Sequence, residues 1–251
     1  MAIKIIKSVE MKCIRSMCLF VICLCMFSPA HATKTLLNHV KATSQAMSAF
    51  YMQSLSEGND KYLKEFKVFK RQSLTLLKQY ARDNGPQSKE LLHKWQGFSD
   101  RLVFTYDKEY GWEVDSRVRQ DFRSYLSDIY ELVDKQKNNY ASKAHKKLLS
   151  VVQMEAVSAR FFDVSSSYNV KVSIFASDTN KLDPKVVSSD FKKNLDTLAS
   201  MNGDAAAKRQ LASVKSKWKF IENSVVNYEG HGAYFLVYAT KNKIQQALAA
   251  R

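Results

Sequence analysis

Apolar side chains recur at alternating steps of three and four residues along most of this chain, and that spacing restricts its fold more than any other feature. Such steps return to one side of an α-helix, so each run predicts a helix with a single apolar stripe. The clearest runs cover residues 62–80, 118–132, 154–168 and 211–228. Because a stripe of this kind has to be covered by a neighbouring helix, the pattern favours a helical bundle.

Turn-forming residues divide the chain into helical segments. Only three prolines and seven glycines occur among 251 residues, and turn sequences stand at 56–60, 84–86, 178–184 and 202–204. Sustained alternation of apolar and polar residues, which is typical of a strand, is lacking apart from a short ambiguous piece at 171–175. We therefore predict an all-α protein, an elongated up-down helical bundle.

The two halves of the chain carry similar landmarks. The sequence Phe-Lys-Arg at 69–71 is followed by Thr-Leu at 75–76, and Phe-Lys-Lys at 191–193 is followed by Thr-Leu at 197–198. Each is then followed by an Asn-Gly turn and a helix with one tryptophan. We predict two duplicated helical hairpins, a first helical repeat at 33–137 and a second at 138–251, packed into one bundle. The alternative is a chance likeness between two amphipathic hairpins.

Trp95 and Trp218 are the expected anchors of the hydrophobic core. Each lies on an apolar stripe, with further apolar residues three and seven positions later. Large aromatic side chains bury the most apolar surface when they face a helical neighbour. The six residues that we predict for the structural core are Trp95, Phe98, Leu102, Trp218, Ile221 and Val225.

The N-terminal part of the chain has the features of a cleavable export signal. Lys12 and Arg15 give it a basic start, the apolar run 17–27 follows, and Ala30-His31-Ala32 provides small residues at a cleavage site. We therefore expect residues 1–32 to be a signal peptide, with Met11 as an alternative start. The protein is then expected to be periplasmic or secreted.

The predicted signal also limits what the remaining chain can contain. Its apolar run is shorter than the roughly 20 residues needed to span a bilayer, and no later run is longer, so we expect no transmembrane segment after cleavage. All four cysteines lie inside the signal. The chain from residue 33 onward therefore has no disulfide and no cysteine ligand for a metal.

The chain is strongly basic, with a formal net charge of +15. Such a charge favours anionic partners, including lipid headgroups, acidic proteins and small anions. The lysines are spread along every predicted helix, so the alternative is a solvated lysine-rich surface. No nucleic-acid-binding motif occurs, and an exported protein would not meet nucleic acid routinely, so we predict no nucleic-acid partner.

Catalytic and cofactor motifs are lacking in the sequence. There is no H-E-x-x-H, no G-x-S-x-G, no P-loop and no dinucleotide-binding glycine set. The histidines that would follow cleavage (His39, His93, His145 and His231) do not have metal-ligand spacing. We therefore predict that the protein is not an enzyme and has no metal and no cofactor, with a metal site assembled across helices as the alternative.

One short motif connects the sequence with a known family. Val157-Ser158-Ala159-Arg160 matches the S-x-R core of a helix motif of the form R-M-L-S-Q-R, although the corresponding Ser48-Ala49-Phe50 lacks the arginine. With the tryptophan helix and the segment 235–244, the chain resembles the periplasmic helical module of type IV pilus chemotaxis transducers and nitrate-sensor kinases. The resemblance implies a helical bundle that pairs as a homodimer, with Arg160 as the residue that binds a small anion.

Two segments supply the candidate ligand-binding residues. Ser158 and Arg160 come from the motif, and Arg160 falls off the apolar stripe of its helix, so we expect its side chain to be exposed unless it faces a groove. Tyr228, His231 and Tyr234 surround two glycines that would open a kink or loop within a helical region. The alternative for this second segment is a plain connector between two helices.

These observations together favour a binding role. We expect an exported, non-enzymatic helical bundle that acts as a soluble, sensor-like module and binds a small anion or an envelope protein between its helices. The alternative is a structural or interaction protein that attaches to anionic envelope or host surfaces through its cationic faces.

Overall fold

The computed structural model describes residues 29–109, 111–167, 182–201, 203–228 and 233–249. Within them the chain is almost entirely helical, which confirms the prediction of an all-α bundle. The helices are α2 (Pro29–Leu55), α3 (Asp60–Asp83), α4 (Gly85–Ser99), α5 (Ser116–Lys135), the 3₁₀ turn η1 (Lys137–Asn139), α6 (Lys143–Ser165), α7 (Pro184–Ser200), α8 (Ala205–Asn227) and α9 (Tyr234–Ala249). The predicted signal lies mostly outside these residues, and its last four residues begin α2.

Polar side chains at the helix starts explain where several helices begin. The carboxylate of Asp115 accepts hydrogen bonds from the backbone amides of Arg117 and Val118, so Asp115 is the N-cap of α5. Asp183 caps α7 in the same way, and Pro184 occupies the first turn of that helix. The turn at Asn84 separates α3 from α4, as the sequence predicts.

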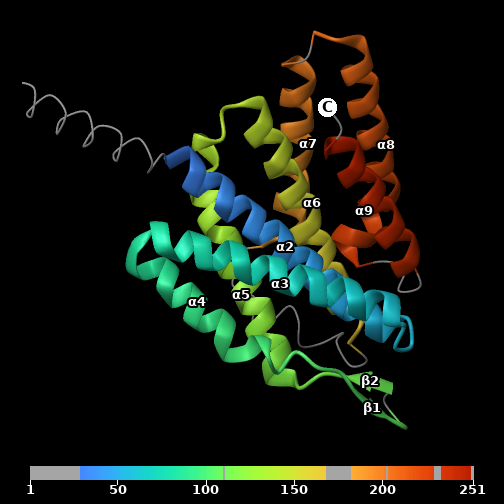
Figure 1. Cartoon of the computed structure of the whole chain (residues 1–251). Helices are drawn as coiled ribbons and strands as arrows, with labels where there is room; N and C mark the ends of the chain where they lie inside the picture. The colour runs from blue at the N-terminus through green and yellow to red at the C-terminus, as the bar shows by residue number, and fades with distance from the viewer. Residues whose placement is uncertain (1–28, 110, 168–181, 202, 229–232, 250–251) are drawn as a thin grey trace, which may run out of the picture.

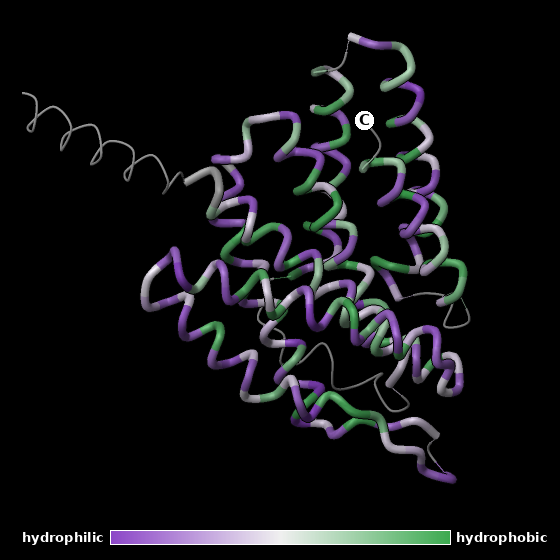
Figure 2. The backbone as a smooth tube through the Cα atoms, viewed as in Figure 1, coloured by the Kyte–Doolittle hydropathy of each residue, from purple (hydrophilic) through white to green (hydrophobic). Residues whose placement is uncertain are grey.

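Helices α2 and α6 pack against each other in the middle of the molecule (Figure 1). Helix α2 also contacts α3 and α5, and α6 also contacts α7, α8 and α9. The outer helices change repeatedly between hydrophilic and hydrophobic residues along their length, as expected for helices with one buried side (Figure 2). In α6, by contrast, every residue from 149 to 164 is buried. Because α6 is covered on all sides, its polar residues have to find partners inside the protein.

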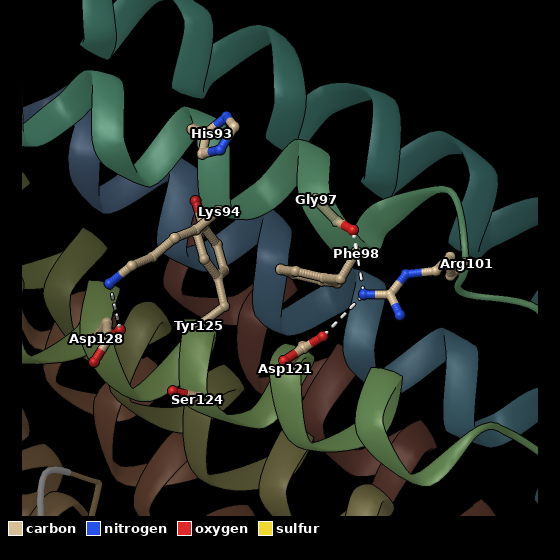
Figure 3. Close-up of a pocket in the computed structure, with 9 residues that line it drawn as sticks. All are labelled: His93, Lys94, Gly97, Phe98, Arg101, Asp121, Ser124, Tyr125 and Asp128. Carbon is tan, nitrogen blue, oxygen red and sulfur yellow. Dashed lines mark hydrogen bonds and ion pairs between the residues drawn. The ribbon is translucent and has the colours of Figure 1, made fainter.

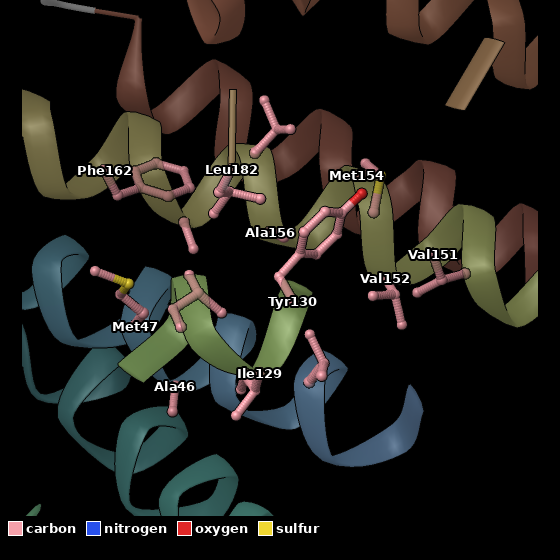
Figure 4. Close-up of a cluster of buried hydrophobic side chains, with 14 of the residues drawn as sticks. Ala46, Met47, Ile129, Tyr130, Val151, Val152, Met154, Ala156, Phe162 and Leu182 are labelled. Atoms are coloured by element: carbon pink, nitrogen blue, oxygen red, sulfur yellow. The ribbon is translucent and has the colours of Figure 1, made fainter. Parts of the chain in front are cut away.

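The hydrophobic core is continuous between the two halves of the chain. Figure 4 shows where α2, α5 and α6 meet, with Met47 of α2, Ile129 of α5 and Met154 of α6 among the buried side chains. All six residues predicted for the core are buried as well, namely Trp95, Phe98, Leu102, Trp218, Ile221 and Val225. None of the helices in the described residues combines the length and the apolar character that crossing a membrane requires.

A short hairpin that the sequence pattern does not predict interrupts the helices between α4 and α5. Strands β1 (Thr105–Asp107) and β2 (Gly111–Glu113) pair antiparallel, with Tyr106 opposite Trp112. The two rings pack 5.6 Å apart between centroids, and Ser54 of α2 donates a hydrogen bond to the Trp112 carbonyl at 3.0 Å. A three-residue strand is too short to show alternation in the sequence, so the aromatic pair and the contact with α2 decide this structure.

Candidate functional site

Three arginines surround one buried carboxylate between α5 and α6. Asp163 of α6 is fully buried, and Arg123 of α5 donates from Nε to its Oδ2 at 2.7 Å. Arg119, one turn earlier on α5, donates from Nη1 to Oδ1 at 3.2 Å. Arg160, three residues before Asp163 on α6, places Nη1 at 3.4 Å from Oδ2. These four residues are called the arginine cluster below.

The arginines keep Asp163 ionised. Burial by itself would raise the pKa of this carboxyl group, but the nearby guanidinium groups of Arg123, Arg119 and Arg160 outweigh burial and hold its pKa below the ordinary value. The cluster itself therefore contains three positive charges and one negative charge. A carboxylate that already carries its charge also fixes the planes of the guanidinium groups that bind it.

Arg119 connects the arginine cluster with the C-terminal end of α6. Its Nη1 donates to the carbonyl of Asp163 at 2.9 Å and to Ser166 Oγ at 3.1 Å, and it also contacts Ser167 Oγ. A cation is stabilised at this position by the partial negative charge of a helix C-terminus. The guanidinium also lies 4.8 Å from the ring centre of Tyr51, a cation–π contact.

The three arginines differ in their access to solvent. The Arg160 side chain is 4% exposed, whereas those of Arg119 and Arg123 are 11% and 16% exposed. Arg119 and Arg123 therefore reach the edge of the cluster, while Arg160 lies behind them. Tyr51 is also fully buried, and burial followed by the charge of Asp163 raises the pKa of its phenol far above the ordinary value. Its ring therefore remains neutral.

The expectation that Arg160 is exposed is wrong. The prediction assumed that α6 has one apolar side, so that a residue off the stripe would face water. Helix α6 is buried all round, so a residue off the stripe is buried too, and Arg160 is held there by its ion pair with Asp163. Ser158 is also buried, and within the described residues its Oγ has no hydrogen-bond partner.

The structure does not bring the second group of predicted residues into the arginine cluster. Tyr228 ends α8 in a left-handed conformation with φ 56°, and Tyr234 begins α9, where its ring packs 4.8 Å from that of Phe235. Both belong to elements other than α5 and α6. His231 lies outside the described residues, so the prediction for it stays a prediction.

Sequence reasoning missed Arg119, Arg123 and Asp163. Arg119 and Arg123 stand four residues apart on α5, directly after the apolar residues Val118 and Phe122, so a pair of cations beside the stripe was the available signal. Asp163 gives no such signal, because a carboxylate at the end of a helix is normally exposed.

A second buried polar network joins α6 to α9 and α2. Lys241 of α9 and Glu155 of α6, both buried, form an ion pair at 2.9 Å. Gln45 of α2 lies 3.5 Å from the other oxygen of Glu155 and donates to Gln245 at 2.9 Å. Removing a charge from water is costly unless it is paired, so this network restricts how α9 can pack on α6.

A third network surrounds a buried histidine. His39 of α2 places Nδ1 3.0 Å from the carbonyl oxygen of Ser73 and Nε2 2.8 Å from the hydroxyl of Tyr125. A carbonyl only accepts, so Nδ1 carries the proton and Nε2 accepts from the tyrosine. Burial lowers the pKa of His39 to about 4, and the bond to Ser73 opposes this only in part. His39 is therefore a neutral core residue.

The comparisons with known proteins add no relative. No family model, no curated protein and no solved structure matches this chain. Among the described residues, no group of three or more histidines, cysteines and acidic residues is placed to hold a metal ion. The fold and the site define an all-α helical-bundle protein with a buried arginine cluster.

Proposed function

We propose that the chain is an exported, non-enzymatic helical-bundle module that binds a small oxyanion at the arginine cluster. The observation that carries this proposal is the meeting of three guanidinium groups at one buried carboxylate. The export signal expected from residues 11–32 supplies the location, and the resemblance of the segment around Arg160 to the periplasmic sensor module agrees with an anion as ligand.

The chemistry of the cluster suits an oxyanion. A guanidinium is planar, always charged, and presents donors in a fixed fork that fits carboxylate, phosphate and similar groups. Asp163 orients Arg119 and Arg123, whose side chains are 11% and 16% exposed at the edge of the cluster. An anion that reaches this edge would meet donors that Asp163 already holds in place. Its binding would therefore cost these side chains little further conformational entropy.

The test is thermal unfolding of the chain from residue 33 onward against nitrate, nitrite, phosphate, sulfate and citrate, with chloride as the reference salt. A ligand at 100 times its dissociation constant adds about 2.7 kcal/mol. For a domain of this size we expect the midpoint to rise by roughly 5–10 °C.

The two matched variants keep the positive charge and remove only the planar guanidinium group. Arg123→Lys should abolish most of the rise, because an ammonium cannot bind an oxyanion with two parallel hydrogen bonds. Arg71→Lys, at an exposed position of α3, should leave it unchanged. The proposal fails if none of the anions raises the midpoint above the chloride reference, or if Arg123→Lys responds as the unsubstituted protein does.

A second candidate function is attachment to an anionic surface, and the outer side of α8 favours it. Lys208, Arg209 and Lys219 are exposed there, together with Phe220, whose side chain is 65% exposed. Cations on the same side of a helix as an exposed aromatic residue are suited to anionic headgroups. Vesicles with anionic lipid should then bind the protein in a salt-dependent way, and Phe220→Ala should weaken this binding. Vesicles of neutral lipid should bind neither the unsubstituted protein nor Phe220→Ala.

A further inference from the structure

A groove of about 380 Å³ runs between α4 and α5, apart from the arginine cluster (Figure 3). Arg119 and Arg123 stand four residues apart on one side of α5, whereas Asp121, Tyr125 and Asp128 lie on the side that lines the groove. With 3.6 residues per turn, position 121 faces nearly opposite to position 119. Helix α5 therefore separates the two sites.

The floor of the groove is apolar and its wall is open. Phe98 of α4 and Tyr125 of α5 are both buried and their ring centres lie 5.6 Å apart. Gly97 lies in α4 beside them, and a Cβ added there would meet nothing within 4 Å. A glycine within a helix costs about 1 kcal/mol relative to alanine. Here it leaves free the space that a side chain would take.

Each end of the groove carries an ion pair of the same polarity. Lys94 of α4 lies 3.5 Å from Asp128 of α5 at one end, and Arg101, two residues after α4 ends, lies 3.0 Å from Asp121 of α5 at the other. The two carboxylates are seven positions apart in α5, which is about 10 Å along the helix axis. Figure 3 shows the side chains of Lys94 and Arg101 reaching across to the carboxylates on α5.

We propose that this groove binds a short zwitterionic peptide of about three residues with a hydrophobic middle side chain. Three extended residues span about 10 Å, which matches the distance between the two charged ends. The peptide carboxylate would pair with Arg101, since a guanidinium fork fits a carboxylate best. The peptide ammonium would pair with Asp128, and the middle side chain would pack on Phe98 and Tyr125.

The resident ion pairs do not prevent such binding. The side chains of Arg101, Asp121 and Lys94 are about half exposed, and that of Asp128 is 26% exposed. Pairs of this kind contribute about 0–1 kcal/mol, so opening them for a ligand costs little. A ligand with one charge of each sign can replace one partner in each pair without leaving a buried charge unpaired.

The first experiment is a calorimetric titration of the protein with the peptide Ala-Phe-Ala. The free peptide should bind, and blocking its ends by N-acetylation and C-amidation should weaken binding at least tenfold. The substitution Gly97→Leu should fill the groove and also weaken binding at least tenfold without lowering the unfolding midpoint. Gln96→Leu, an exposed position on the same helix, should bind as the unsubstituted protein does.

A second comparison tests the orientation of the peptide. Arg101→Gln should weaken the binding of the free peptide several-fold. It should not further weaken the binding of the C-amidated peptide, which has no carboxylate to pair with Arg101. The proposal is overturned if the free peptide does not bind, if the blocked peptide binds equally well, or if Gly97→Leu binds as before. Arg123→Lys should leave peptide binding intact, because Arg123 does not line the groove. A negative result for the peptide can therefore be told apart from a negative result for the oxyanion site.

Discussion

Asp163 shows how burial and charge act on one residue. Its folded-state pKa lies below the ordinary value because the arginines outweigh burial. Folding therefore favours the ionised form, and this contribution is fully present above the unfolded-state pKa of about 4. It is lost as the pH falls through the lower folded-state pKa.

The substitution Asp163→Asn should strongly destabilise the protein. It leaves three guanidinium groups close together without a compensating carboxylate, and breaking a buried ion pair in this way costs about 3–5 kcal/mol. Chemical denaturation at neutral pH measures this loss. Asp121→Asn, which removes one exposed partner of Arg101, should cost less than about 1 kcal/mol. Equal losses in the two variants would contradict the importance of burial.

His39 should make the stability of the folded protein depend on pH in a different range. Its pKa is about 4 in the folded protein and about 6.5 in the unfolded chain, so between these values the unfolded chain binds the extra proton. Stability should therefore fall as the pH drops from 6.5 to 4, by about 3 kcal/mol in total. Denaturation curves across this range measure the slope. The dependence of the unfolding free energy on pH in this range should be lost in His39→Asn. It should be kept in His93→Asn, which changes an exposed position.

At the scale of elements, the hairpin depends on one glycine of the α2–α3 turn. Gly58 has φ +83°, and a Cβ there would overlap with the indole of Trp112. The strands themselves have three residues each, so the packing of Trp112 on this turn and the bond from Ser54 hold the hairpin in place.

The substitution Gly58→Ala should cost about 2–4 kcal/mol, because backbone strain at positive φ adds to the displacement of Trp112. Gly85→Ala is the matched control, since Gly85 has φ +75° but open space around its Cβ position. It should cost only the strain of about 1–2 kcal/mol. Tryptophan fluorescence should change with Gly58→Ala alone. If both variants lose equal stability, the contact with Trp112 is unimportant.

At the scale of the whole molecule, the contact between α2 and α6 should make the two halves unfold as one cooperative unit. The buried residues of both halves form a single cluster. Each half has its own tryptophan in this cluster, Trp95 on α4 and Trp218 on α8. A local loss of packing in one half should therefore lower the stability of the whole protein.

Trp95→Ala and Trp218→Ala should each cost about 3–5 kcal/mol, the usual loss for removal of a buried aromatic side chain. Helical circular dichroism and tryptophan fluorescence should report the same unfolding midpoint in each variant. Trp112→Ala, at a half-buried hairpin position, should cost less. Losses below about 1 kcal/mol at both core tryptophans, or two separate transitions, would contradict the single core.

The predicted duplication stays a prediction. Within the described residues, four α-helices stand on each side of the connection between α5 and α6, and α2 and α6 each begin one set. Gln45 and Glu155 stand three residues before the corresponding Ser48 and Ser158, and they lie against each other at the contact between α2 and α6. A comparison of the two sets of helices after superposition would test whether these positions correspond throughout.

The sequence by itself determined the helices, most of their boundaries and the apolar residues that face the core. Periodicity, caps and turns act over a few neighbouring residues, so residues such as Asp115, Pro184 and Trp218 carry this information locally. Only the tertiary structure decided the surroundings of Arg160, the partners of Asp163 and the place of Trp112. These depend on residues more than forty positions away, such as Arg119 for Asp163, and on the covering of α6 from every side. Local sequence cannot show burial of that kind, because burial is a property of the packed molecule.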